Sequence, residues 1–172
     1  MLRKNLLQRK GVRLKEYNYN TSGVYFLTIC TENRKNVLCK IVGCDVLDAP
    51  QKIEMFSYGI IAKTKIENLS TYYKNVSIES YVIMPNHLHI LLRVYEKDGS
   101  SSMSTPTSRQ HATVPKIVSA FKRACNKEYG QNIWQRSFYD HVIRNEKDYN
   151  EHLKYIQNNP KSWVLDELFK EE

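Results

Sequence analysis

The most regular pattern in the chain lies at residues 87–94, where every second residue is apolar and the positions between are polar except Leu91. Successive side chains of a β-strand point to opposite faces of its sheet. The alternation therefore predicts a strand whose apolar face packs under helices and consists of Leu88, Ile90, Leu92 and Val94. His87 and His89 are predicted to project together from the other face.

Runs of β-branched and aromatic residues predict three more strands, over residues 24–31, 37–42 and 76–83. The first two are separated by a short polar segment, so we expect them to pair with each other as a hairpin. The third is joined to the histidine strand by residues 84–86 alone, and this short connection makes the two strands antiparallel neighbours.

Three segments carry apolar residues at steps of three and four, the spacing of one helical face. They span residues 57–74, 113–129 and 148–159, and Ser57 and Thr113 are the expected N-caps of the first two. On the second helix, the residues expected to face inward are Ile117, Val118, Phe121 and Cys125, and those expected to face outward are Lys116, Lys122, Arg123 and Lys127.

The order of these elements predicts an α+β fold: a two-layer, ferredoxin-like domain with a mainly antiparallel sheet. The first two helices would cover one face of the sheet and leave the other face to the histidines. We expect a single domain over residues 1–172, with a basic tail at residues 1–16 and a flexible loop at residues 96–112, where large apolar residues are almost lacking.

Composition narrows the choice of partner. The chain has 26 Lys and Arg against 18 Asp and Glu, a formal net charge of +8, which favours a polyanion such as nucleic acid. Its four cysteines lack C-x-x-C spacing, so we expect reduced, buried thiols and a cytoplasmic protein. No stretch is long enough to span a membrane and no signal peptide is recognisable, so a membrane partner is not expected.

Two groups of side chains suggest chemistry. A pair of neutral imidazoles aimed at one point is half of a site for a divalent metal, although a bare His-x-His is also consistent with two ordinary polar residues on a wet strand face. In the last helix, Tyr155 is predicted to be turned away from the apolar stripe that includes Tyr149, and to share a polar face with His152 and Asn159. A metal that polarises a phosphodiester for attack by a tyrosine hydroxyl would use both groups.

Three segments resemble one known family. YVIMPNHLHILL (residues 81–92), WQRSFYDHVIRNEKDY (134–149) and KYIQNNPKSW (154–163), in this order and at these spacings, are similar to the HUH single-tyrosine transposases, especially the REP-associated tyrosine transposases. The opening at residues 9–34 also resembles that branch. The similarity covers most of the chain and is far more specific than His-x-His alone.

The resemblance implies roles for individual residues. The family's metal-binding histidines fall on His87 and His89, its nucleophilic tyrosine on Tyr155, and its third ligand on Asn159, with His152 as a second choice. Because Asn159 precedes Pro160, its side chain is expected to swing off the ideal helical face. The ion implied is Mg²⁺ or Mn²⁺. We expect the imidazoles and the phenol to converge around it in a cleft open to DNA.

The resemblance also implies contact with single-stranded DNA next to a hairpin. Aromatic side chains can stack on unpaired bases, and Arg can hold phosphates or guanine edges. The candidate DNA-binding residues are Trp134, Gln135, Arg136, Arg144, Asn145, Lys122 and Arg123.

The expected function is therefore a metal-dependent single-stranded DNA endonuclease and strand transferase, a transposase that forms a 5′-phosphotyrosine. Two alternatives are a non-catalytic nucleic-acid-binding protein derived from this fold and a metal-dependent phosphodiesterase that uses water. The sequence leaves open whether the protein is a monomer or a homodimer that exchanges its tyrosine helix.

Overall fold

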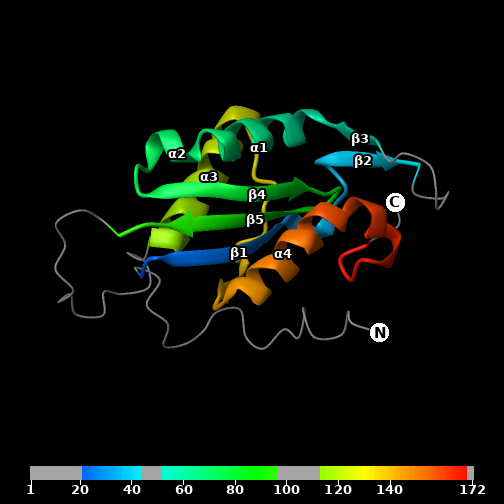
Figure 1. The fold of residues 1–172 in the computed structure, drawn as a ribbon. Helices are drawn as coiled ribbons and strands as arrows, with labels where there is room; N and C mark the ends of the chain where they lie inside the picture. Colours follow the sequence, from blue (N-terminus) through cyan, green and yellow to red (C-terminus); the bar gives the residue numbers. More distant parts are fainter. Residues whose placement is uncertain (1–20, 44–51, 97–112, 170–172) are drawn as a thin grey trace.

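The computed structural model describes residues 21–43, 52–96 and 113–169, and Figure 1 shows their arrangement. The predicted basic tail and residues 97–112 of the predicted loop lie outside the described residues. None of the helices formed by the described residues is both long enough and apolar enough to cross a membrane.

The main sheet has four antiparallel strands in the order β4-β5-β1-β6. They are β1 (Gly23–Cys30), β4 (Val76–Ile83), β5 (His87–Val94) and β6 (Tyr139–Ile143). A separate two-stranded sheet pairs β2 (Cys39–Val42) with β3 (Lys52–Met55). The predicted α+β fold with an antiparallel sheet is confirmed.

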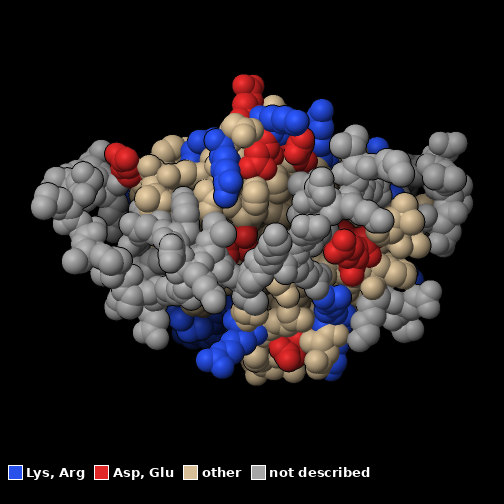
Figure 2. Space-filling model, turned by 90° about the horizontal axis from the view of Figure 1, so that it is seen from below, with Lys and Arg blue, Asp and Glu red and all other residues tan. Residues whose placement is uncertain are grey.

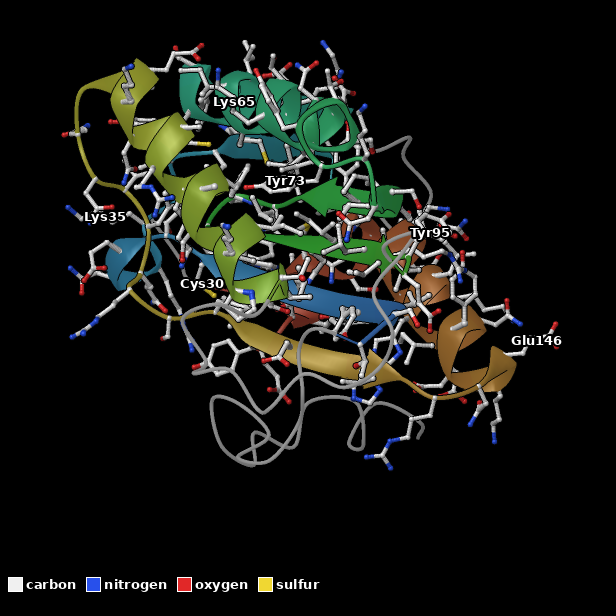
Figure 3. The ribbon with its side chains drawn as sticks, turned by 90° about the vertical axis from the view of Figure 1, so that its left-hand side faces the viewer. Cys30, Lys35, Lys65, Tyr73, Tyr95 and Glu146 are labelled. Atoms are coloured by element: carbon white, nitrogen blue, oxygen red, sulfur yellow. The ribbon has the colours of Figure 1, made fainter. Side chains whose placement is uncertain are left out.

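The helices of the described residues lie on both faces of the main sheet (Figures 1 and 3). Helices α1 and α3 pack against one face and are tied to each other by an ion pair between Lys65 and Glu128. Helix α4, which begins at Glu146, covers the other face. The bounds are α1 Ser57–Glu67, α2 Leu69–Tyr72, α3 Thr113–Tyr129 and α4 Glu146–Asn158, with 3-10 helices η1 Glu32–Arg34 and η3 Pro160–Leu165.

Alternation along β1 and β5 creates a separate core on each face. The four apolar residues expected to share one face of β5 all belong to the larger core, under α1 and α3. The second, smaller core lies under α4 and contains Phe26, Leu91, Ile156 and Trp163. His87 and His89 face this second core, as the alternation predicts.

The predicted hairpin between the first two strands is wrong. Both edges of β1 are occupied, one by β5 and the other by β6. The chain turns away after β1 through η1, where Asn33 and Arg34 have positive φ values of 55° and 53°. β2 therefore pairs with β3 instead, through Ile41 and Ile53 among others.

The helix boundaries required two corrections. The segment predicted as one helix at residues 57–74 is two, because Asn68 interrupts it between α1 and α2. Ser57 is the first residue of α1, and the N-cap position belongs to Phe56, whose side chain makes no capping hydrogen bond. Helix α3 ends at Tyr129 as predicted, but Thr113, the expected N-cap, lies within the helix as its first described residue. All four residues expected to face inward on α3 are buried.

Two buried thiols support the prediction of reduced cysteines. Cys39 and Cys125 are free and buried, and Cys30 is buried as well. Burial raises the pKa of the Cys39 and Cys125 thiols to about 12, which leaves both protonated and unreactive at neutral pH. Cys44 lies outside the described residues.

Gly59 is required for α1 to approach the segment before β2. A β-carbon at this position would overlap the backbone carbonyl oxygen of Leu38, which also accepts a hydrogen bond from the amide of Phe56 at 3.0 Å. We expect Gly59→Ala to lower the free energy of unfolding by about 1–3 kcal/mol. The backbones of α1 and of Leu38 cannot move apart to make room for the methyl group without breaking the hydrogen bond between Phe56 and Leu38. Urea denaturation measures the change.

Gly130→Ala is the matched control, because it adds the same methyl group where no other atom lies within 4 Å. It places alanine at a positive φ of 79°, a conformation that costs about 1 kcal/mol. A loss for Gly59→Ala no larger than that for Gly130→Ala would show that the close approach at Leu38 does not matter.

Candidate functional site

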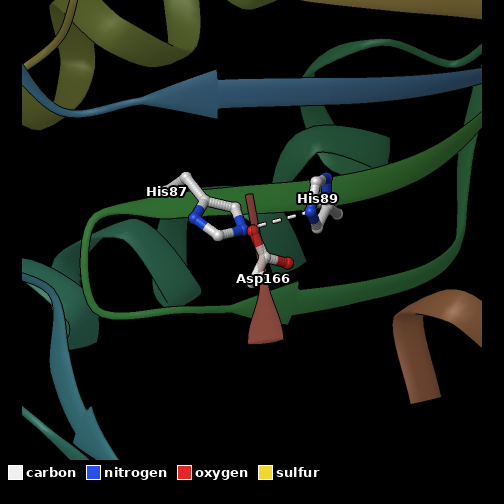
Figure 4. Close-up of side chains that lie close together, drawn as sticks. All are labelled: His87, His89 and Asp166. Carbon is white, nitrogen blue, oxygen red and sulfur yellow. Dashed lines mark hydrogen bonds between the residues drawn. The ribbon is translucent and has the colours of Figure 1, made fainter. Parts of the chain in front are cut away.

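Strand β5 brings two imidazoles together on the face of the sheet that α4 covers. The side chains of His87 and His89 are both 0% exposed, and their Nε2 atoms lie 3.1 Å apart (Figure 4). This separation is close to that of two ligands on one metal ion, since metal–nitrogen distances of about 2.1 Å at a tetrahedral angle put two ligand atoms about 3.4 Å apart.

Neighbouring polar groups set the orientation of both rings. The Asn86 amide nitrogen donates to the carbonyl of Leu168, so the Asn86 amide oxygen is the atom that faces His87. Nδ1 of His87 therefore donates to that oxygen at 2.8 Å and leaves the Nε2 lone pair free. Nδ1 of His89 lies 2.9 Å from the hydroxyl of Thr28. With the proton on this Nδ1 as well, the two Nε2 lone pairs face each other, an arrangement that a bound cation stabilises.

Burial keeps both imidazoles neutral, which is the form that binds metals. Desolvation, helped by the positive charge of Arg34, lowers the pKa of His87 to about 3. Desolvation and the neighbouring His87 lower the pKa of His89 well below its usual value. Neither ring is protonated at neutral pH.

A carboxylate completes the group. Asp166 follows η3, and one of its oxygens lies within 4.8 Å of a ring nitrogen of each histidine (Figure 4). Its Oδ2 accepts hydrogen bonds from the Tyr155 hydroxyl at 3.1 Å and the Asn159 amide at 3.0 Å, and its Oδ1 accepts one from the Leu168 backbone at 2.7 Å.

Asp166 was missed by the sequence analysis. The prediction placed the third ligand on α4, four residues after Tyr155. Asp166 reaches the histidines only because η3 turns the chain back toward the sheet. The spacing of apolar and polar residues does not predict that turn. The one available signal is Pro160, which ends α4 and stands at the start of the 3-10 helix.

Helix α4 places Tyr155 beside the histidines. Asn145 caps the helix, with its side-chain oxygen accepting from the Asp148 amide at 2.9 Å. The Tyr155 ring centroid lies 5.2 Å from that of His89 and 5.9 Å from that of Phe26, both edge-on. The residues expected to share one site therefore lie together within one chain.

The prediction that Tyr155 is turned away from the apolar stripe is wrong. Its ring is half-buried and packs against the second core, as does that of Tyr149. The buried face of α4 is wider than its apolar residues indicate, because His152 is also buried in it. A polar side chain can be buried there because it finds a partner, as the Tyr155 hydroxyl does at Asp166.

The surroundings of Tyr155 oppose its ionisation. Burial, and next the negative charge and hydrogen bond of Asp166, raise the pKa of the phenol above its ordinary value. The phenol is therefore neutral in this arrangement. A cation that offsets the charge of Asp166 would favour the phenolate.

Asn159 lies next to the group, in a conformation that the sequence analysis did not predict. Its backbone is helical, with φ −57° and ψ −44°, so the expected swing of the residue before Pro160 is wrong. Pro160 instead continues the chain into a 3-10 helix. The Asn159 side-chain oxygen is buried and has no hydrogen-bond partner. Such an oxygen is available to a metal ion.

His152, the second choice for a third ligand, is not grouped with the His87–His89 pair. Its Nδ1 lies 2.8 Å from the backbone oxygen of Asp148 and 3.1 Å from its carboxylate. It groups instead with Asp148 and His141.

The site is closed, whereas the sequence predicts an open cleft. Trp163 of η3 is buried, and its ring centroid lies 5.9 Å from that of His87. Ile156 of α4 packs in the same core. Apolar side chains on both elements seal the histidines from solvent, because removing this surface from water is favourable.

The candidate DNA-binding residues divide into buried and exposed ones. Trp134 is 1% exposed and packs on Phe121, so its ring cannot stack on a base. Lys122 points inward, and its ammonium donates to the backbone oxygens of Gln135 at 2.7 Å and Ser137 at 2.8 Å. The prediction that it lies on the outer face of α3 is wrong.

The remaining candidates lie nearer the surface. Gln135 is partly buried, whereas Arg123, Arg136, Arg144 and Asn145 are exposed. On the face seen in Figure 2, Lys and Arg of the described residues lie in several separate groups with acidic side chains between them. The Lys and Arg side chains of the described residues therefore do not form one continuous patch on this face.

The chain is similar in sequence to proteins of two bacteria. No family model matches the chain. An uncharacterized protein of Haemophilus influenzae is 33% identical over 174 residues, covering 94% of this chain and 93% of its own length. A REP-associated tyrosine transposase of Escherichia coli is 30% identical over 155 residues, covering 88% of this chain and 76% of its own length.

A solved structure of a REP-associated tyrosine transposase bound to a REP hairpin has a similar fold. It superposes with a TM-score of 0.57 at 23% identity, over 86% of this chain and 73% of the other.

Proposed function

Because the chain belongs to the family of REP-associated tyrosine transposases, which cleave and rejoin DNA strands, we propose that it cuts single-stranded DNA next to a hairpin and holds one end as a 5′-phosphotyrosine on Tyr155. The relative of known structure was bound to a REP hairpin, which supports hairpin DNA as the partner. The observation that carries the proposal is the contact of the Tyr155 hydroxyl with Asp166, in a group with two imidazoles.

The residues of this group fit a divalent metal. His87, His89 and Asp166 offer two nitrogens and one oxygen, and the unpartnered side-chain oxygen of Asn159 is a fourth candidate. Such a mixed set suits Mn²⁺ better than Mg²⁺, because Mg²⁺ prefers oxygen ligands and keeps several waters. When bound, the ion would polarise the phosphate and offset the negative charge that builds up on it.

The chain's own groups account for the transfer step. The Tyr155 oxygen attacks phosphorus, the new O–P bond forms, and the bond from phosphorus to the 3′ oxygen breaks. The phenolic proton passes to Asp166, the acceptor that it already contacts, and the leaving 3′ oxygen takes a proton from water. Attack of a 3′-hydroxyl on the phosphotyrosine reverses the same steps and rejoins the strand.

Two features bear on how DNA enters. A phosphate can reach the buried histidines only if residues 160–169 move outward, because Trp163 and Asp166 lie over the pair. Arg123, Arg136, Arg144 and Asn145 are the exposed candidates for holding the strand.

Since Tyr155 and the histidines meet within one chain, the site favours action as a monomer over exchange of the tyrosine helix.

The test is incubation with hairpin-bearing oligonucleotides and Mn²⁺, followed by a denaturing gel. A 5′-phosphotyrosine retains the 3′ portion of the DNA, so oligonucleotides labelled at the 3′ end should give a labelled protein band. The same DNA labelled at the 5′ end should give only a free, shortened strand. EDTA should abolish both products.

The other outcomes separate the alternative functions. Metal-dependent cleavage without a covalent band would indicate a phosphodiesterase that uses water. Hairpin binding without cleavage at any Mn²⁺ concentration would indicate a non-catalytic DNA-binding protein. Either result would overturn the proposed transfer.

A further inference from the structure

We propose that His141, Asp148 and His152 form a second metal site that takes a borderline divalent transition-metal ion such as Zn²⁺. The ligand atoms of these three side chains all lie within 4.8 Å of one another. The group does not share a residue with the His87, His89 and Asp166 group, and the proposal does not depend on the tyrosine chemistry.

Two neighbouring elements bring the ligands together. His141 stands on β6, while Asp148 and His152 lie one turn apart on the first turns of α4. Residues four apart on a helix share a face, so both side chains point toward the strand. The two imidazole rings are stacked nearly in parallel, with an interplanar angle of 15° and centroids 4.6 Å apart.

Both imidazoles aim a nitrogen at the same carboxylate. Nε2 of His141 lies 2.9 Å from Oδ2 of Asp148, and Nδ1 of His152 lies 3.1 Å from Oδ1. Ligands about 2.1 Å from a tetrahedral ion are about 3.4 Å apart. Each of these two imidazole nitrogens therefore lies only a few tenths of an ångström closer to the carboxylate than it would with both groups bound to one ion, and the two nitrogens lie within 4.8 Å of each other.

The ligand chemistry favours zinc over the harder ions. Two imidazoles and one carboxylate, with a further position open to water, match the ligand types that Zn²⁺ binds in proteins. Because a neutral imidazole can move its proton to the other ring nitrogen, binding requires no net loss of protons from a neutral ring. The His141 side chain is 46% exposed, which gives an ion a route into the site.

One aromatic ring contacts both groups. The Phe26 ring stacks on His89 with centroids 4.9 Å apart, and its centroid lies 4.6 Å from that of His152. An ion at the second site would tie β6 to the start of the helix that carries Tyr155.

The competing interpretation is a simple ion pair. Asp148 also accepts a hydrogen bond from the backbone amide of Arg144 at 3.0 Å, so it has a structural role at the start of α4. An ion pair between His141 and Asp148 would stabilise the fold equally with and without metal. A metal site would stabilise it only when metal is present.

The test compares Zn²⁺ binding by the full chain, His141→Ala and His87→Ala, with equilibrium dialysis and thermal unfolding on the same samples. We expect His141→Ala to bind one equivalent less than the unmodified protein and to lose part of the rise in Tm caused by Zn²⁺. His87→Ala should keep the equivalent that depends on His141, so the double variant should lose both.

Two controls make the result decisive. His141 is exposed on an edge strand, so its replacement should leave the far-ultraviolet circular dichroism unchanged. Asp148→Asn, which keeps the size of the side chain, should lose the same equivalent. Equal Zn²⁺ binding by His141→Ala and the unmodified protein would overturn the proposal, as would a loss of Tm for His141→Ala that is the same in EDTA as in Zn²⁺.

Discussion

Replacing Tyr155 with phenylalanine is expected to abolish the covalent protein–DNA band while hairpin binding stays within about twofold of the unmodified protein. The substitution removes the oxygen that attacks phosphorus. Its ring contacts with His89 and Phe26 remain possible, so the fold should be kept. A denaturing gel measures the adduct, and a native gel with the same hairpin DNA measures binding.

Tyr149→Phe is the matched control for this experiment. Tyr149 lies on the same helix, is also half-buried, and donates its hydroxyl to Glu79 at 3.1 Å rather than to the histidine group. It should form adduct at a rate within a few-fold of the unmodified protein. Adduct formation by Tyr155→Phe, or its loss in Tyr149→Phe alone, would move the nucleophile away from Tyr155.

Asp166→Asn is expected to weaken Mn²⁺ binding by about 10- to 100-fold and to reduce adduct formation by at least as much. The amide cannot offer the negative oxygen that complements two neutral imidazoles, nor accept the phenolic proton. Titration of the protein with Mn²⁺, followed by the paramagnetic resonance signal of the free ion, measures the affinity without reference to activity.

Glu167→Gln provides the comparison, because it removes the same charge from the next residue, which is exposed. It should leave Mn²⁺ affinity nearly unchanged. If Asp166→Asn also leaves Mn²⁺ affinity unchanged but slows adduct formation, Asp166 acts as a proton acceptor and is not a ligand. If neither quantity changes, its contacts with Tyr155 and Asn159 are only structural.

The features that follow from a local period could be predicted from the sequence. Alternation along β5 placed His87 and His89 on one face, and the structure has their Nε2 atoms 3.1 Å apart. The antiparallel pairing of β4 with β5 followed in the same way from a short connection. These predictions depend on neighbouring residues alone, which is why they were confirmed.

The features that depend on the rest of the molecule could not be predicted in this way. The predicted hairpin of the first two strands was wrong because β6, which comes more than 100 residues later in the chain, occupies an edge of β1. The amphipathic pattern of α3 places Lys122 outside, but backbone carbonyls of Gln135 and Ser137 draw its ammonium inward. Asp166 lies beside the histidines because of the turn at η3, which the spacing of apolar residues does not predict. In each case a tertiary partner outweighs the local preference.

The identity of the residue that becomes attached to DNA tests the central claim most directly. After cleavage of hairpin DNA with Mn²⁺ and nuclease trimming, trypsin would separate the two tyrosines of α4, since Tyr149 lies in the peptide of residues 148–154 and Tyr155 in that of residues 155–161. Fragmentation in a mass spectrometer then locates the added nucleotide. We predict that it is on Tyr155; a nucleotide on Tyr149 or on any other residue would contradict the account.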